Sequence, residues 1–303
     1  MPLLERLRRL SRVLPQSRSA AKPKSSPIMR GGRGCENPSC SAPRRPLSAP
    51  PRRCFEGKWM CSDACWSSVL RQRIERELGI SDPGSMVMPV HRVPLGLVLL
   101  SMGSITEAEL QTALEQQRQT KQGRIGDWIR KGTDLGEKEI TRALGMQWNC
   151  PIFDLAAYRA QPAEIPRELI EIYRILPLPA RNRGMLYLAF DRALNPVASF
   201  AVQHITGLRV EAGLAGESAF EDAWARSLEM QTPAAAMVAP RTKEELIEVA
   251  TSVLQNDDVS DASLARLHQH LWLRVFTASE EQGGSGAYRD YLLLIPESSK
   301  SRS

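Results

Sequence analysis

The sequence predicts an α+β protein that carries a small cysteine-rich module. Three observations predict this class: two repeated amphipathic segments, five cysteines between residues 35 and 65, and short apolar runs typical of strands farther along the chain. A chain of 303 residues with 42% hydrophobic residues can bury a sizeable core, and its length favours two or three compact units. The expected parts are an N-terminal four-Cys zinc knuckle, a helical paired-repeat subdomain, a small α/β subdomain, and a C-terminal helix with a β-hairpin.

Composition and charge divide the chain into six expected segments. They are a basic, disordered tail at 1–34, a four-Cys zinc-binding module with a helix at 35–80, a helical paired-motif subdomain at 90–150, an α/β subdomain at 151–228, a linker at 229–241, and a C-terminal helix and hairpin at 242–303. The tail holds nine Lys or Arg and one Glu, so the net charge of +6 reflects the N-terminus rather than the repeats. No apolar run approaches the ~20 residues that span a membrane, and no cleavable signal is found. We expect a cytoplasmic protein.

The tail has three interpretations. Leucines and arginines alternate at helical spacing over residues 1–14, a pattern typical of an amphipathic helix that touches an anionic membrane surface or a partner. The content of Pro, Ser, Gly, Lys and Arg at 15–34 favours a disordered leader. A start of translation at Met29 is the third interpretation. Membrane contact is expected only through residues 1–14, if at all.

Cysteine spacing indicates a metal site. Cys35 and Cys40 form one close pair, Cys61 and Cys65 form another, and a loop of 20 residues separates them. Two such pairs suit tetrahedral Zn²⁺, because each pair chelates and the loop brings the pairs together. Four thiolates leave no open coordination position, so the zinc would be structural. The alternative is a set of ordinary buried or free thiols, and Cys54, which has no partner at chelating spacing, is the best example.

Four arginines in the loop of this module would suit contacts with phosphate: Arg44, Arg45, Arg52 and Arg53. The cysteine spacing is not that of a two-Cys two-His finger, and no RNA-binding signature with interleaved aromatic residues is present. Prolines also break the arginine run into a loop. The module is therefore expected to dock a protein, and nucleic-acid binding is the less favoured alternative.

Residues 94–117 and 124–147 are two copies of one pattern, offset by 30 residues. The matching positions are Gly96 and Gly126, Leu99 and Ile129, Ile105 and Leu135, Leu110 and Ile140, Ala113 and Ala143, Leu114 and Leu144, and Gln117 and Gln147. Each copy opens with a glycine beside an apolar residue, crosses a turn, and closes in an amphipathic helix. Two such units predict a paired helical structure.

The copies read PLGLVLLSMGSITEAELQTALEQQ and RIGDWIRKGTDLGEKEITRALGMQ. They resemble the paired cyclic di-GMP-binding motifs of the MshEN domain, the N-terminal domain of GspE-type secretion ATPases and type IV pilus ATPases. The segments CPIFDL, PRELIEIYRILPLPARNRGMLYLAFDRALNPVASF and AVQHITGLRVEAGLA resemble the α/β half of that domain, so the resemblance covers roughly residues 90 to 225. It implies cyclic di-GMP as a ligand and a component of a secretion or pilus machine as a partner.

The second copy carries the groups that such a ligand needs. Arg124 could stack on a guanine or pair with a phosphate, Asp127 could accept from guanine N1 and N2, and Gln147 could read a guanine edge. Gly126 would let the ligand approach the backbone. The apolar floor would be Ile125, Ile129, Ile140 and Leu144. The corresponding candidates of the first copy are Leu95, Gly96, Leu99, Leu110, Leu114 and Gln117, but Pro94 replaces the arginine there and brings neither charge nor a backbone donor.

No catalytic pattern is found in the sequence. The phosphate-cradling G-x-x-x-x-G-K-[ST] loop of secretion ATPases is missing from these 303 residues, and the four histidines form no metal or triad pattern. We therefore expect a non-enzyme. Two functions fit: a receiver that binds cyclic di-GMP and signals to a secretion or pilus machine, or a docking scaffold of the same fold that has lost the ligand.

The remaining elements follow from periodicity and turn chemistry. Residues 185–190 and 208–215 read as strands with a helix at 194–206 between them, which is an α/β unit. Thr242 and Glu245 form a capping-box pattern at the start of a helix. The runs HLWLRVFT and YRDYLLLIP predict a hairpin. Its large side chains either pack in the protein's own core, which we favour, or offer a docking edge; they are Trp272, Phe276, Tyr288 and Tyr291.

Overall fold

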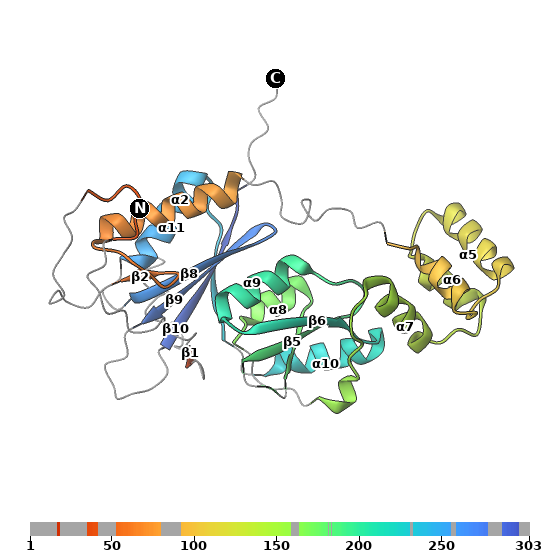
Figure 1. Cartoon of the computed structure of the whole chain (residues 1–303). Coiled ribbons are helices and arrows are strands. Elements are labelled where there is room, and N and C mark those ends of the chain that lie inside the picture. Colours follow the sequence, from red (N-terminus) through yellow and green to blue (C-terminus); the bar gives the residue numbers. More distant parts are fainter. Residues whose placement is uncertain are drawn as a thin grey trace, which may run out of the picture.

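The computed structural model contains helical, α/β and sheet-forming parts (Figure 1). It describes residues 17–18, 35–41, 53–79, 92–158, 164–180, 182, 184–230, 233–255, 259–277 and 287–296. The predicted helix at 1–14, Met29, and the loop arginines Arg44, Arg45 and Arg52 lie outside these residues. Among the described helices, none combines the length and the apolar character that crossing a bilayer requires.

The two sequence copies form two helix-turn-helix units, as predicted. The helices of the first copy are α4 (Leu95–Ser101) and α5 (Glu107–Thr120), and those of the second are α6 (Ile125–Gly132) and α7 (Glu137–Trp148). Thr106 caps α5 in a capping box, because its hydroxyl accepts from the Glu109 amide at 3.3 Å while the Glu109 carboxylate accepts from the Thr106 amide at 2.7 Å. The turn of the first copy uses Gly103 at φ 66°, where a residue without a Cβ meets no strain.

The α/β part follows α7 and contains a three-stranded sheet. Its strands are β4 (Leu176–Pro179), β5 (Met185–Phe190) and β6 (Arg209–Leu214), in the order β4-β5-β6. Its helices are α8 (Arg167–Tyr173), α9 (Pro196–Thr206) and α10 (Glu217–Glu229), and a short 3-10 helix, η1, spans Leu155–Ala157. The predicted strand-helix-strand unit is therefore β5-α9-β6, in which the two strands are parallel.

The cysteine module and the C-terminal part share one seven-stranded sheet. The path of this sheet is β1-β10-β9-β8-β2-β3, and β7 pairs in parallel with β10. Its strands are β1 (Ser17–Arg18), β2 (Cys54–Phe55), β3 (Lys58–Trp59), β7 (Ala235–Val238), β8 (Val259–Leu267), β9 (His270–Thr277) and β10 (Ala287–Leu294). The helices α2 (Asp63–Gly79) and α11 (Lys243–Leu254) lie against it (Figure 1). Strands from the cysteine module and from the C-terminal part thus lie in one sheet.

Both faces of this sheet are buried, and the side chains of β9 and β10 alternate between two cores. Leu273 and Tyr291 face α2 and α11, whereas Trp272 and Leu292 face the α/β part around α8 and α9. Because both faces are covered, successive residues of β9 are buried rather than every second one. The large side chains of the hairpin pack in the protein's own core, as we favoured: Trp272, Tyr288 and Tyr291 are at most 2% exposed.

A buried ion pair joins the sheet to the α/β part. Arg274 on β9 donates to both carboxylate oxygens of Asp290 on β10, at 2.8 Å each, and to the carbonyl of Glu164 at 2.6 Å. The indole of Trp272 donates to the same carboxylate at 2.7 Å. Arg274 and Asp290 are each 1% exposed. Burial of these two charges is tolerated because they pair with each other and because Trp272 and the Glu164 carbonyl supply further hydrogen bonds.

Three strands depart from the sequence predictions. Residues 229–241, expected to be a linker, contain β7, whose small apolar residues fit beside β10. Residues 259–267 form a third long strand, β8, so the predicted hairpin is part of a larger sheet. β4 was not predicted as a strand. It contains Pro177 and Pro179, which are tolerated because β4 lies at the edge of its sheet. The predicted segment boundaries otherwise stay predictions.

The packing of α2 on the C-terminal sheet predicts a specific loss of stability. Leu70 of α2 is 0% exposed in the core that it shares with α11 and the sheet. Leu70→Ala should lower the free energy of unfolding by about 2 to 5 kcal/mol, because it removes buried methyl groups and leaves a cavity. Urea unfolding measures this change. The neighbouring exposed substitution Arg71→Ala should change it by less than about 0.5 kcal/mol, and equal effects would show that α2 does not share this core.

Candidate functional site

The two repeat copies interlock rather than stand side by side. The first helix of each copy packs against the second helix of the other: α4 against α7, and α6 against α5. The glutamine that ends each copy likewise contacts the other copy. Gln117 donates to the carbonyl of Gly123 at 3.0 Å, just before the second copy, and Gln147 donates to the carbonyl of Val93 at 2.7 Å, just before the first. These bonds make the repeat an approximate two-fold unit.

The second copy lines a cleft of about 270 Å³, called here the motif cleft. One wall comes from α6 and α7, and the other comes from the loop after β5 and the start of α10. The lining residues are Leu95, Arg124, Ile125, Gly126, Asp127, Arg130, Glu137, Ile140, Thr141, Leu144, Gln147, Trp148, Asp191, Arg192 and Glu217. The motif cleft therefore combines an apolar floor with three arginines and four carboxylates.

The candidate residues of the second copy gather in this cleft with one exception. Those that line it are Arg124, Ile125, Gly126, Asp127, Ile140, Leu144 and Gln147. Ile129 does not line it, because it is 0% exposed in the core between the helices. Gln147 uses one amide hydrogen for the carbonyl of Val93, but a glutamine amide has a second donor and an acceptor that can still meet a ligand.

The first copy contributes one candidate residue to the motif cleft. Leu95 lines it and also packs beside Gly126, where an added Cβ would come within 3.3 Å of the leucine side chain. The other first-copy candidates lie elsewhere: Gly96, Leu99, Leu110, Leu114 and Gln117. Leu99 and Leu110 belong to the helical core, and Leu110 covers Gly96 so closely that an added Cβ would approach it to 2.5 Å. The two copies thus differ in what they present to the cleft.

Seven lining residues were not predicted from the sequence: Arg130, Glu137, Thr141, Trp148, Asp191, Arg192 and Glu217. Three of them come from the α/β part, so repeat matching could not find them. One signal was present. Asp191 and Arg192 directly follow β5, and the carboxyl ends of strands in an α/β unit are where ligand-binding groups collect.

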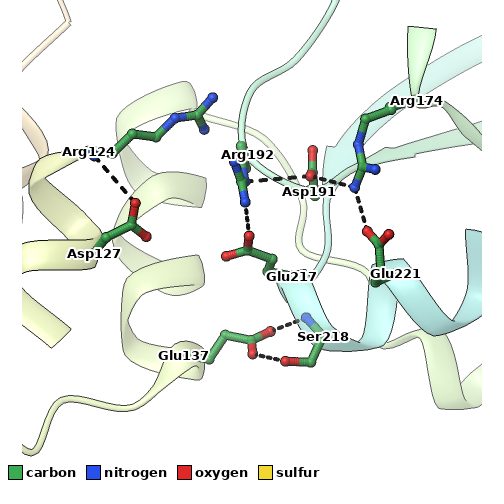
Figure 2. Close-up of polar contacts among 9 residues, drawn as sticks. All are labelled: Arg124, Asp127, Glu137, Arg174, Asp191, Arg192, Glu217, Ser218 and Glu221. Atoms are coloured by element: carbon green, nitrogen blue, oxygen red, sulfur yellow. Dashed lines mark hydrogen bonds and ion pairs between the residues drawn. The ribbon is translucent and has the colours of Figure 1, made fainter. Parts of the chain in front are cut away.

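An ion-pair chain orders the α/β wall of the cleft (Figure 2). Arg192 pairs with Glu217 and lies 3.6 Å from Asp191, which in turn lies 3.1 Å from the guanidinium of Arg174. Arg174 also pairs with Glu221 at 2.6 Å. The hydrogen bond that Arg192 donates to the Glu217 carboxylate raises the pKa of Arg192 above its ordinary value, so this cation stays charged at the edge of the cleft.

Arg124 lies on the opposite wall and is less constrained. Its backbone amide donates to the Asp127 carboxylate at 3.3 Å, which fixes the start of α6. Its exposed side chain extends in the direction of Arg192 (Figure 2). The two guanidinium groups therefore come from different subdomains but serve one cleft, and an anion between them would be contacted from both walls.

Glu137 holds the two walls together. Its carboxylate accepts from the backbone amide of Ser218 at 2.9 Å and from the Ser218 hydroxyl, both in the first turn of α10 (Figure 2). A carboxylate in this position satisfies a helix-terminal amide and complements the positive end of the helix. α7 and α10 are thus tied where both begin.

The four predicted ligand cysteines come together. The Sγ atoms of Cys35, Cys40, Cys61 and Cys65 all lie within 4.8 Å of one another. Cys61 Sγ is 3.5 Å from both Cys40 Sγ and Cys65 Sγ, near the spacing of about 3.8 Å that a tetrahedron of Zn–S bonds of about 2.3 Å gives. The arrangement can hold one metal ion.

Local capping sets the geometry of this cysteine cluster. Ser62 caps α2 by accepting from the Cys65 amide at 3.2 Å, which places Cys65 on the first turn. Asn37 is buried between the first two cysteines; its side chain lowers the pKa of Cys65 to about 6 by hydrogen bonding. Cys54 lies outside the cluster on β2, where burial raises the pKa of its thiol to about 11.

The fold and the cleft define a helical repeat pair docked on an α/β unit, and the comparison with known families agrees with that class. The family model of the MshEN domain matches residues 148–234, which include the α/β part that directly follows the two motifs. The family resemblance predicted from the sequence is confirmed.

Individual proteins are similar over a limited part of their length. The type IV pilus assembly ATPase PilB of Thermus thermophilus is 29% identical over 130 residues, which cover 42% of this chain and 14% of that protein. The chain therefore spans about one seventh of this relative.

Among solved structures, that of MshE with cdg is 25% identical, with a TM-score of 0.38, and the match covers 45% of this chain and 99% of that one. The N-terminal domain of XpsE is 20% identical, with a TM-score of 0.33, covering 44% and 92%.

The tie between α7 and α10 makes a prediction about local stability. Glu137→Ala should leave the first-turn amides of α10 without their cap, a loss of about 1 kcal/mol. Amide hydrogen exchange at Ser218 and its neighbours should then become about five times faster, because local opening costs less. Lys138→Ala, an exposed change on the same turn, is the control. Exchange in α10 that is the same in both variants would contradict the role of Glu137.

Proposed function

We propose that this protein is a non-catalytic regulatory or adaptor protein of a type II secretion or type IV pilus system that binds cyclic di-GMP in the motif cleft. The observation that carries the proposal is the convergence of Arg124, Asp127 and Gln147 from the second copy with Arg192 from the α/β part on one cleft. The family match and the similarity to a pilus assembly ATPase support the kind of system. The proposal retains the cytoplasmic location expected from the sequence.

The chemistry of the cleft suits this ligand. The phosphates of a cyclic dinucleotide need cations, and Arg124 and Arg192 flank the cleft from opposite walls. A guanine edge presents N–H donors, for which the Asp127 carboxylate is an acceptor. The purine faces need apolar surface, which Ile140 and Leu144 supply on α7.

Binding would act on the joint between subdomains. A ligand that contacts α6, α7 and the loop after β5 favours the arrangement in which these elements lie together, by its differential affinity for that state. The surface around the contact between the repeat pair and the α/β part would then bind a component of the secretion or pilus machine. This route needs no chemical step, in keeping with a receiver rather than an enzyme.

A docking scaffold without the ligand is the second candidate. The observation in its favour is that the glutamines ending both copies donate to main-chain carbonyls, a structural role that a repeat needs even when it binds nothing. Nucleic-acid binding has less support, since Arg53, the one described member of the predicted arginine set, is paired with Asp63 and donates to the Leu254 carbonyl.

We also propose that Zn²⁺ binds the cysteine cluster as a structural ion, with Cys35, Cys40, Cys61 and Cys65 as ligands. The support is the mutual distance of the four thiols and the soft sulfur chemistry that zinc prefers. Cys35 and Cys65 also pack against the core around α2. The ion would therefore hold the segment before β2 against the sheet. The cysteine module would then bind a protein partner.

The first test is calorimetric titration with cyclic di-GMP. We expect saturable binding, and we expect Arg124→Ala to weaken it about tenfold or more, because a charge-assisted bond to phosphate is lost. Arg142→Ala is the matched control, since Arg142 is exposed on α7 but does not line the cleft. Wild-type protein that does not bind below ~100 µM would favour the scaffold, and binding unaffected by Arg124→Ala would contradict the site.

The zinc proposal is tested by metal analysis of purified protein. We expect about one zinc per chain, lost in Cys61→Ser, together with a lower unfolding temperature, because binding energy of the ion is folding energy. Cys150→Ser, outside the cluster, should retain the metal. Metal-free wild-type protein with an unchanged unfolding temperature would refute the proposal.

A further inference from the structure

A second cleft of about 410 Å³ lies next to the motif cleft. Trp148 and Asp191 line both, so the two clefts meet at these residues. The second cleft is closed on its other sides by Arg92, by Arg174 at the end of α8, and by the residues around the start of α9. It was not predicted from the sequence, and no residue of the two motifs other than their flanking positions contributes to it.

Arg92 brings a cation to this second cleft. Its guanidinium carbon lies over the Trp148 ring, 3.2 Å from the ring centroid, so the side chain contacts an aromatic face. No carboxylate within the described part of the chain forms an ion pair with it. Arg174 differs, because Asp191 and Glu221 both neutralise it. A planar guanidinium that lies on an aromatic ring can contact a phosphate or stack on a base.

Cations are distributed on both sides of the shared boundary. Arg124 lines the motif cleft and Arg92 lines the second cleft, whereas Arg192, at the motif cleft, is already paired with Glu217 and Asp191. The motif cleft alone, at about 270 Å³, falls slightly below the range of about 300 to 1,000 Å³ usual for small-molecule sites. A ligand with two anionic groups and two aromatic units would match the pair of clefts better than either cleft alone.

We propose that the second cleft is a subsite for the second nucleotide unit of a cyclic dinucleotide whose first unit occupies the motif cleft. Arg92, stacked on Trp148, supplies the cation for that unit. This inference rests on the proposed function and adds residues outside the two motifs to the ligand site. It also gives the ligand a contact with the α8 to α9 region, far from the repeats in sequence.

Two substitutions test the subsite by different physical means. Arg92→Ala removes the cation, and Ala193→Trp fills the second cleft from an exposed position that tolerates a large side chain. Each should weaken cyclic di-GMP binding about tenfold in a calorimetric titration while the stoichiometry stays at one ligand per chain. Arg142→Ala should bind as wild type does, and unchanged thermal unfolding of each variant confirms that it is folded.

The outcomes separate this inference from the proposed function. Binding that is lost in Arg124→Ala but unchanged in Arg92→Ala and Ala193→Trp would overturn the subsite and leave the motif cleft as the whole site. Two ligands per chain, of which Arg92→Ala removes one, would overturn it as well, because the clefts would then be independent. Absence of binding by wild-type protein would reject the proposed function and the subsite with it.

Discussion

The rest of the structure depends on α7, a helix of 12 residues that belongs to two cores at once. Ala143 is 0% exposed in the core between the repeat helices, whereas Leu144 and Trp148 pack against the core of the α/β part. One helix therefore fixes the repeat pair relative to the α/β unit. Glu137 reinforces this joint at the start of the helix, and the motif cleft exists only because the joint holds both walls in place.

The interlocked packing explains why two similar copies have different surfaces. In an exact two-fold pair each copy would line an equivalent cleft, but only α7 is followed directly by the α/β part. Leu110 of the first copy therefore remains a core residue, whereas its counterpart Ile140 lines the cleft opposite Asp191 and Arg192. Pro94 adds to the difference, since it begins α4 at the position where Arg124 begins α6. Asymmetry of the cleft follows from the chain connection as much as from the substitutions.

Local patterns predicted local structure well. The capping of α11 by Thr242, the helix-turn-helix repeats and the gathering of four cysteines all follow from short-range spacing. Long-range pairing was not predictable in this way. β2 pairs with β8 across the whole chain, and β7 is too short and too rich in alanine to be distinguished from a linker before its partner is known. Arg192 was missed for the same reason, because its role depends on where α7 docks.

The central claim is that cyclic di-GMP binds where the second copy meets the α/β part. Methyl NMR of isoleucine-labelled protein tests it most directly, because the isoleucines are spread over the structure. Addition of cyclic di-GMP should shift the methyl signals of Ile125 and Ile140, which line the motif cleft, and leave those of Ile105 and Ile165, which are buried and do not line it, nearly unchanged. Unchanged signals at Ile125 and Ile140, or larger shifts at Ile105, would contradict the account.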